Sequence, residues 1–165
     1  MKVVYSDLKN KRVFISGGGS GIGATIVEHF CEQKSEVYFI DIDLKSSKKL
    51  IKKIKKKGYR VPKFIECNIL DVKKLQNIIK DIISKKGAIH CLINSAANDD
   101  RHTTEQVDEK YWENRMGINL KHYFFAAQAV VKVMKKIKSG SIVNLSSVSW
   151  VLGEGDKVVY ETAKS

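Results

Sequence analysis

The sequence is poor in residues that cross-link or interrupt a chain. Its 165 residues include one proline and three cysteines, Cys31, Cys67 and Cys91, without a C-x-x-C pair. An odd number of widely spaced cysteines argues against a disulfide framework and favours a reducing, cytoplasmic setting, so we expect small buried thiols. The four histidines show no metal-ligand spacing, and no metal site is expected.

Long apolar runs are also absent. The best candidate, residues 123–131, is interrupted by Gln128 and is too short to cross a bilayer. Residues 1–7 contain neither an apolar segment nor a small-residue cleavage site, so we expect no secretion and no membrane association. A hydrophobic content of 43% is typical of a folded protein, and residues 1–165 are interpreted as a single domain.

Positive charge is in excess, with a formal net charge of +12. Eight lysines and no acidic residue lie in 45–57. Leu44, just before this segment, forms an apolar stripe with Leu50, Ile51 and Ile54. This pattern predicts an amphipathic helix with a solvated lysine face. No aromatic residue interleaves with the lysines, as a single-strand binder would require, so we expect no nucleic-acid partner.

Short β-rich segments alternate with helical segments along the chain. The expected strands are residues 12–16, 36–40, 63–67, 90–94 and 141–145. The expected helices are residues 22–33, the lysine segment 45–57, a segment capped by Asp71, and about 108–138. Such alternation builds β-α-β units, so the predicted fold class is α/β, a Rossmann-type doubly wound parallel sheet with five strands.

A glycine-rich loop joins the first expected strand to the first expected helix. It contains Gly17, Ser20, Gly21, Ile22 and Gly23. Glycines let a backbone turn tightly and approach a pyrophosphate, whose charge the helix N-terminus favours. The alternative is a plain tight turn, and the position between strand and helix favours the binding role.

An acidic residue follows the second expected strand. Asp41 lies at about the spacing typical of an acid that accepts hydrogen bonds from the adenosine ribose. A carboxylate there would repel a 2′-phosphate, so NAD is expected rather than NADP. Asp43 is a rival for this role, and a simple strand-end acid is the other alternative.

The last residues of the chain carry a tyrosine and a lysine one helical turn apart. Tyr160 and Lys164 share one helical face, and Ser147 lies thirteen positions before the tyrosine. An ammonium favours the phenolate form that a general base requires. Ser147 can hold a reacting oxygen at the phenol, with Ser146 as the competing serine.

This set, with Asn119 in Ile118-Asn119-Leu120 and the glycine loop, resembles the short-chain dehydrogenase/reductase family. The resemblance covers the whole chain and implies that Tyr160 is the general base of an oxidoreductase. It implies that Lys164 and Ser147 assist Tyr160 and that Asn119 supports a water relay.

The same resemblance implies further cofactor contacts besides Tyr160 and Lys164. Asn68 stands where the family usually has an aspartate, and its carbonyl oxygen could bond the adenine amino group beside Ile69. Asn94 matches the first asparagine of an Asn-Asn-Ala-Gly motif, which here has the sequence Asn-Ser-Ala-Ala.

Segments 98–102, 122–130 and 147–150 resemble bacterial NAD-dependent aldose 1-dehydrogenases. This likeness implies a sugar substrate, contacted by Ser147, Tyr160 and three further residues, Asn98, Asp99 and Trp150. The alternatives are a steroid, polyol or 3-ketoacyl substrate, or a nucleotide-binding module without catalysis.

Family members continue beyond the Tyr-x-x-x-Lys motif. The resemblance therefore implies that this chain is an N-terminal part that lacks the last strands, and we expect it to be inactive alone. It also implies that the full-length protein is a homo-oligomer, either a dimer or a tetramer.

Overall fold

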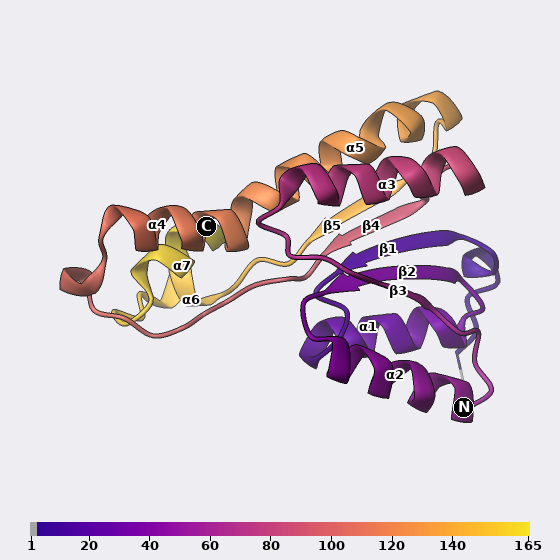
Figure 1. Ribbon diagram of the computed structural model, residues 1–165, viewed down its shortest axis with the longest axis horizontal. Helices are drawn as coiled ribbons and strands as arrows, with labels where there is room; N and C mark the ends of the chain where they lie inside the picture. The colour runs from indigo at the N-terminus through magenta and orange to yellow at the C-terminus, as the bar shows by residue number, and fades with distance from the viewer. Residues whose placement is uncertain (1–2) are drawn as a thin grey trace.

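The computed structural model describes residues 3–165 as a parallel sheet flanked by helices (Figure 1). The strand order is β3-β2-β1-β4-β5, and all four neighbouring pairs are parallel. The strands are β1 (Arg12–Ser16), β2 (Glu36–Asp41), β3 (Lys63–Glu66), β4 (Cys91–Asn94) and β5 (Ser141–Asn144). The predicted α/β fold class is confirmed.

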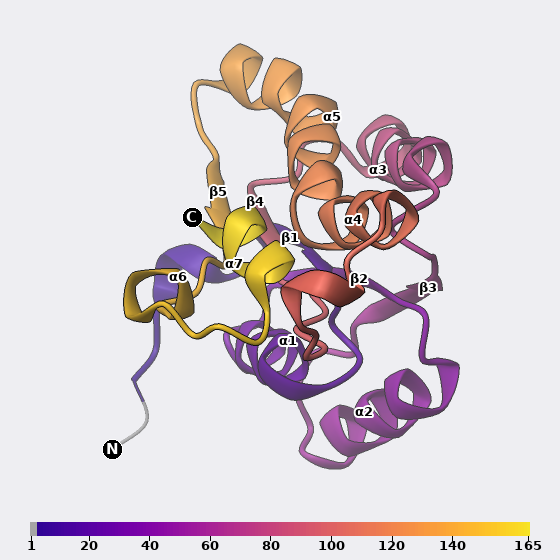
Figure 2. The same ribbon diagram turned by 90° about the vertical axis from the view of Figure 1, so that its left-hand side faces the viewer.

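Helices cover both faces of the sheet. The helices are α1 (Gly21–Glu32), α2 (Leu44–Lys56), α3 (Val72–Lys86), α4 (Glu109–Met116), α5 (His122–Ile137), α6 (Ser149–Leu152) and α7 (Val158–Lys164). Helices α1 and α2 lie on one face, and α3 and α5 on the other (Figures 1 and 2). The short helices α6 and α7 pack together beside α4, beyond the carboxyl ends of the strands.

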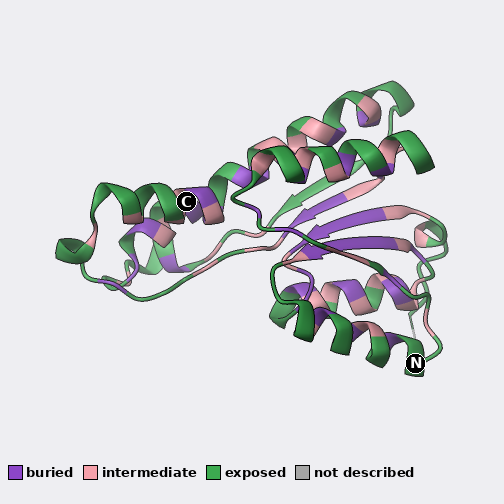
Figure 3. Cartoon of the chain, viewed as in Figure 1, coloured by how far each residue is buried: buried purple, intermediate pink, exposed green. Residues whose placement is uncertain are grey.

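The core consists of two apolar layers, one on each side of the sheet (Figure 3). Strand alternation sends Phe14 toward the α3 and α5 side, while Val13 and Ile15 pack on the α1 and α2 side. These three side chains are fully buried, each worth about 1.5–3 kcal/mol relative to exposure. By contrast, every residue of the edge strand β5 is exposed.

Aspartate side chains cap the N-termini of two helices. Asp71 Oδ1 accepts a hydrogen bond from the Lys74 amide at 2.9 Å, which confirms the predicted cap of α3. Asp43 Oδ1 accepts from the Ser46 amide at 2.9 Å and begins α2 in the same way. No helix in residues 3–165 is long and apolar enough to span a bilayer.

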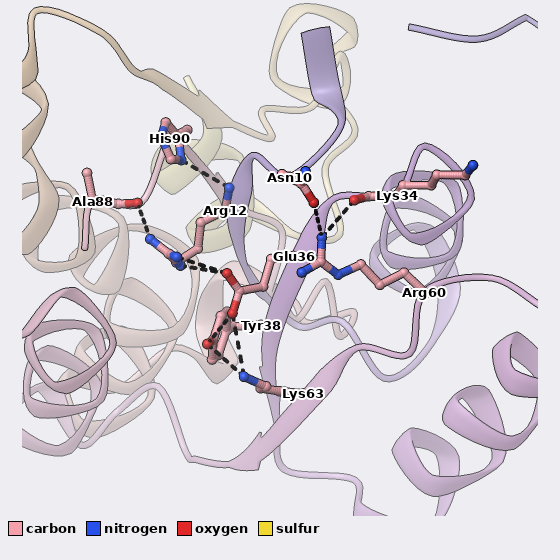
Figure 4. A network of polar contacts seen from close by, with 9 residues as sticks. All are labelled: Asn10, Arg12, Lys34, Glu36, Tyr38, Arg60, Lys63, Ala88 and His90. Carbon is pink, nitrogen blue, oxygen red and sulfur yellow. Dashed lines mark hydrogen bonds and ion pairs between the residues drawn. The ribbon is translucent and has the colours of Figure 1, made fainter. Parts of the chain in front are cut away.

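A polar network fastens the amino ends of the strands, away from their carboxyl edge (Figure 4). Arg12 binds Glu36 through two nitrogens, at 3.1 and 2.9 Å, and donates to the Ala88 carbonyl at 2.8 Å. The Tyr38 hydroxyl donates to Glu36 at 2.7 Å and accepts from Lys63 at 3.0 Å. These contacts tie β1, β2 and β3 together and leave the opposite edge free for ligands.

Two details differ from the sequence-based expectation. The helix expected over 108–138 is interrupted by a wider π-helical turn, Gly117–Lys121, between α4 and α5. In α2, Leu50 and Ile54 are buried, but Leu44, the first residue of the helix, is exposed. Single π turns are frequent at functional sites, and this one contains Asn119.

Candidate active site

A cleft of about 740 Å³ opens at the carboxyl edge of the sheet. Its walls come from the glycine loop, the end of β2, the segments after β3, β4 and β5, the π turn, and α7. Among the predicted site residues, those that line it are Gly17, Ser20, Gly21, Ile22, Gly23, Asp41, Asn68, Ile69, Asn98, Asp99, Tyr160 and Lys164. The fold thus brings the glycine loop and α7, which are far apart in the sequence, to one cavity.

Glycine is needed at three positions of the loop for different physical reasons. At Gly17, where φ is +69°, a Cβ would lie 2.6 Å from the Ala96 Cα, so the loop packs directly on the segment after β4. At Gly23 a Cβ would overlap the Gly17 carbonyl oxygen. At Gly21, where φ is +52°, nothing lies within 4 Å, so the backbone is open toward the cleft.

Asp41 is bound to the glycine loop through its carboxylate. Asp41 Oδ2 accepts from the Gly19 amide at 2.8 Å, and Oδ1 accepts from the Asp43 amide at 2.9 Å. Asp43, the rival acid, also lines the cleft, but its carboxylate caps α2. Among the described residues that line the cleft, Lys164 is the sole cation, and Asp41 and Asp43 are the charged residues at the end of β2.

The two residues expected to contact an adenine, Asn68 and Ile69, lie after β3. Asn68 Oδ1 already accepts from the Leu70 amide at 3.0 Å, so the expected bond to a ligand amino group would have to use its second lone pair. Ile69 is buried in the core layer and also lines the cleft.

Asn94 does not line the cleft, and its role in cofactor contact stays a prediction. Its side chain is completely buried and donates to Asn144 Oδ1 at 2.8 Å. It also lies 3.4 Å from the Tyr123 carbonyl oxygen and so links β4, β5 and α5. The strand alternation that puts Ile93 on one face puts Asn94 on the other. The next residues, Ser95, Ala96 and Ala97, form the wall instead.

Lys164 is anchored by groups that the sequence did not indicate. Its ammonium donates to the Leu145 carbonyl at 2.9 Å and to the Tyr123 hydroxyl. It lies 4.4 Å from the centroid of the Tyr123 ring. Burial lowers the pKa of Lys164 from 10.5 to about 8. A desolvated ammonium beside a phenol can take part in proton transfer at a cleft.

Two neighbouring residues of α5, His122 and Tyr123, lie near this lysine. The Tyr123 hydroxyl donates to the Leu145 carbonyl at 3.1 Å. Burial and, to a smaller extent, the nearby Tyr160 raise the pKa of Tyr123. Burial and, to a smaller extent, the positive charge of Lys164 lower the pKa of His122 to about 3, so this imidazole is neutral at pH 7. Both side chains occur in an apolar helical pattern, which gave no signal for a polar role.

The two serines after β5 occupy different positions. Ser146 lines the cleft, and its hydroxyl donates to the Lys164 carbonyl. Ser147 Oγ lies 2.8 Å from Ser149 Oγ and accepts from the Ser149 amide at 3.2 Å, and it is not part of the lining. Trp150, on α6, is 47% exposed and also lies outside the lining. Their roles toward a substrate stay predictions.

Asn119 is fully buried in the π turn and holds the cleft wall. Its Oδ1 accepts from the Asn98 amide at 2.9 Å, and its Nδ2 donates to the Asn98 carbonyl at 2.9 Å. It therefore clamps the backbone of the segment that presents Asn98 and Asp99. A water relay through Asn119 stays a prediction. No group of three or more potential metal ligands occurs in the described part of the chain.

Known proteins resemble this chain in both sequence and structure. A family model described as short chain dehydrogenase matches residues 11–165. A probable galactose dehydrogenase of Rhizobium meliloti is 38% identical over 98% of this chain and 63% of that protein. D-xylose 1-dehydrogenase of Caulobacter vibrioides is 40% identical, again over 98% and 63%. The chain therefore spans 63% of the length of these curated relatives.

The fold similarity extends to a solved structure. Ligand-free aldohexose dehydrogenase of Thermoplasma acidophilum superposes with a TM-score of 0.83 at 27% identity. The match covers 97% of this chain and 58% of that chain.

Proposed function

The chain belongs to the short-chain dehydrogenase family, and from this premise we propose that it forms the cofactor-binding and proton-transfer part of an NAD-dependent dehydrogenase that oxidises an aldose at C1. The observation that carries the proposal is one cleft lined by the glycine loop, Asp41, Tyr160 and Lys164. A dinucleotide site at one end and a proton-transfer pair at the other are what alcohol oxidation requires. Residues 1–165 would act as one domain.

The residues at the sheet edge fit a dinucleotide. Gly17 and Gly23 leave no room for a side chain, while the Gly21 backbone is open to the cleft, as a close approach to a pyrophosphate requires. The Asp41 carboxylate can accept from ribose hydroxyls and has no cation beside it in the lining, which supports NAD over NADP. When bound, NAD⁺ supplies the hydride acceptor.

The chain's own groups handle the proton. Tyr160 accepts the proton of the C1 hydroxyl as the C1 carbonyl of the lactone forms. The Lys164 ammonium stabilises the phenolate, and its lowered pKa of about 8 suits a group that gives and regains a proton near neutral pH. In this proposal Ser147 holds the reacting oxygen, which requires its hydroxyl to turn from Ser149 toward the cleft.

A sugar substrate is supported by the polar wall of the cleft. Asn98 and Asp99 offer amide and carboxylate partners for hydroxyl groups. The relatives at 38% and 40% identity are named for galactose and D-xylose. More distant relatives at 28% and 29% identity are named as 3-oxoacyl-[acyl-carrier-protein] reductases, so a ketoacyl substrate is the alternative to test. We also propose a cytoplasmic homo-oligomer, a dimer or a tetramer, for the complete protein.

The test uses the 165 residues joined to the C-terminal remainder of the D-xylose 1-dehydrogenase relative, here called the extended chain. The extended chain should form NADH with D-xylose or D-galactose, and the 165 residues alone should bind NAD⁺ without turnover. Oxidation only of a 3-hydroxyacyl substrate, a polyol or a steroid would overturn the sugar assignment. NAD⁺ binding with no turnover by the extended chain on any substrate would instead support a nucleotide-binding module.

A further inference from the structure

His102 connects the cleft wall to the helix that carries Tyr160. It lies at the end of segment 98–102 and is 6% exposed. Its Nδ1 lies 3.0 Å from the Asp100 carbonyl oxygen and 2.9 Å from the Tyr111 hydroxyl on α4. Its Nε2 accepts from the Val159 amide at 3.3 Å, and its own amide donates to the Asp156 carbonyl at 2.7 Å.

These partners fix the tautomer of the imidazole. A backbone amide only donates, so Nε2 must be the unprotonated acceptor for Val159. A carbonyl only accepts, so Nδ1 is protonated and donates its hydrogen bond to the Asp100 carbonyl oxygen. The network therefore assigns His102 as the neutral Nδ1–H form. Both ring nitrogens therefore form hydrogen bonds with backbone groups, Nδ1 with the Asp100 carbonyl and Nε2 with the Val159 amide.

Helix α7 packs against α4 and α6, but its N-cap residue supplies no side-chain hydrogen bond to its first turn. It begins after Lys157, whose side chain makes no capping hydrogen bond, and it has only seven residues. A helix this short is marginal without external contacts, and its first amides have no partner within the helix. Val159 is 1% exposed, so its amide is shielded from bulk solvent. The imidazole supplies an acceptor for this amide one residue before Tyr160.

Ion pairs also lie around this contact. Arg101 pairs with Asp156 and lies 3.5 Å from Glu154, which also pairs with Lys157. On the other side, Arg115 pairs with Asp100 at 2.8 Å, and its guanidinium lies 4.7 Å from the centroid of the Tyr111 ring. The pairs of Arg101 with Asp156 and Glu154 are exposed on both sides and contribute little individually. The side chains of Lys157 and Arg115 are only 9% and 14% exposed, so these two cations also pack around the contact. The buried histidine is the specific link.

We infer that His102 is a positioning residue that sets α7, and with it Tyr160, relative to the cleft wall. Asn119 clamps Asn98 at the start of segment 98–102, and His102 clamps Val159 at its end. The wall that would contact a substrate and the helix that carries the phenol thus share one framework. The consequence for turnover rests on the proposed function, whereas the contact itself does not.

Two variants of the 165-residue chain test the contact. His102→Gln places an amide oxygen near the position of Nε2, while the shorter side chain of His102→Asn reaches only the position of Nδ1. In hydrogen–deuterium exchange, His102→Asn should speed exchange of the peptide covering residues 158–164 by about tenfold or more, because a buried amide loses its acceptor. His102→Gln should stay near wild type, and α1 should be unchanged in both.

The exchange outcomes are decisive in either direction. If His102→Asn does not fold while His102→Gln does, the need for an acceptor at Nε2 is supported. Equal behaviour of the two variants, whether both match wild type or both lose protection throughout, would overturn the inference.

Kinetics of the extended chain test the consequence for Tyr160. His102→Asn should lower kcat by about tenfold or more while leaving the NAD⁺ dissociation constant unchanged, and His102→Gln should restore kcat. An unchanged kcat in His102→Asn would overturn the positioning role. If wild type itself is inactive, the proposed function fails, and the exchange measurement alone decides the contact between His102 and Val159.

Discussion

The Lys164 ammonium lies 5.8 Å from the centroid of the Tyr160 ring, on the same helix, and is held from the other side by Leu145 and Tyr123. The position of the lysine is therefore set by contacts with α5 and with the residue after β5, as well as by its own helix. Its desolvation is a property of this packing, and it affects both stability and the proposed chemistry.

Burial of Lys164 should cost stability at neutral pH. Its pKa falls from 10.5 when unfolded to about 8 when folded, which corresponds to about 3 kcal/mol. The sign follows from proton binding: between these two values the unfolded chain binds more protons, so stability rises with pH across that window. Lys164→Met should therefore be more stable than wild type at pH 7, by up to about 3 kcal/mol.

Urea unfolding of both proteins at several pH values checks this prediction. The advantage of Lys164→Met should shrink as pH rises from about 8 toward 10.5. Lys48→Met, at an exposed position of α2, controls for the loss of a surface lysine. A Lys164→Met protein less stable than wild type at pH 7 would show that the hydrogen bonds of the ammonium outweigh its desolvation.

Asp41 should determine cofactor choice, and Asp43 should not. Asp41→Asn can keep the bond from the Gly19 amide through its carbonyl oxygen while removing the charge that would repel a 2′-phosphate. We expect the ratio of NADP⁺ to NAD⁺ affinity to rise by about tenfold or more. Asp43→Asn is the matched control, because asparagine caps a helix as well as aspartate. Isothermal titration with both cofactors measures the ratio, and a larger change in Asp43→Asn would reverse the assignment.

Gly23 should tolerate no side chain. Gly23→Ala would drive a Cβ into the Gly17 carbonyl oxygen, so the loop must open or the chain must lose about 3 kcal/mol or more. Gly155→Ala is the matched control, since a Cβ there has open space and the backbone needs no positive φ. It should change stability by less than about 0.5 kcal/mol. Denaturant unfolding gives both values, and similar effects in the two variants would contradict the packing described for the loop.

The sequence predicted the sheet closely because its strands are short β-rich runs between turns and helices. Each expected strand agrees with the observed one to within one residue at either end. The glycine loop, Asp41, Tyr160 and Lys164 were predicted as parts of one site because the carboxyl ends of parallel strands meet at one edge. The structure brings them to a single cleft.

Other features depend on contacts between distant segments and could not be predicted. The burial of Asn94 is decided by which face of β4 it occupies. Tyr123 meets Lys164 across 41 positions, and His102 meets Val159 across 57. A tyrosine in an apolar helix and a histidine in a polar loop carry no local signal for these partners. The π turn around Asn119 likewise follows from packing and not from a sequence pattern.

The most direct test of the central claim compares NADH formation by the extended chain and by its Tyr160→Phe variant, with D-xylose and D-galactose as substrates. Phenylalanine keeps the ring and removes the group proposed to accept the proton. We predict turnover of at least one sugar by the extended chain, a loss of about a hundredfold or more in the variant, and unchanged NAD⁺ binding. Equal turnover by the two proteins would contradict the assignment of Tyr160 as the base.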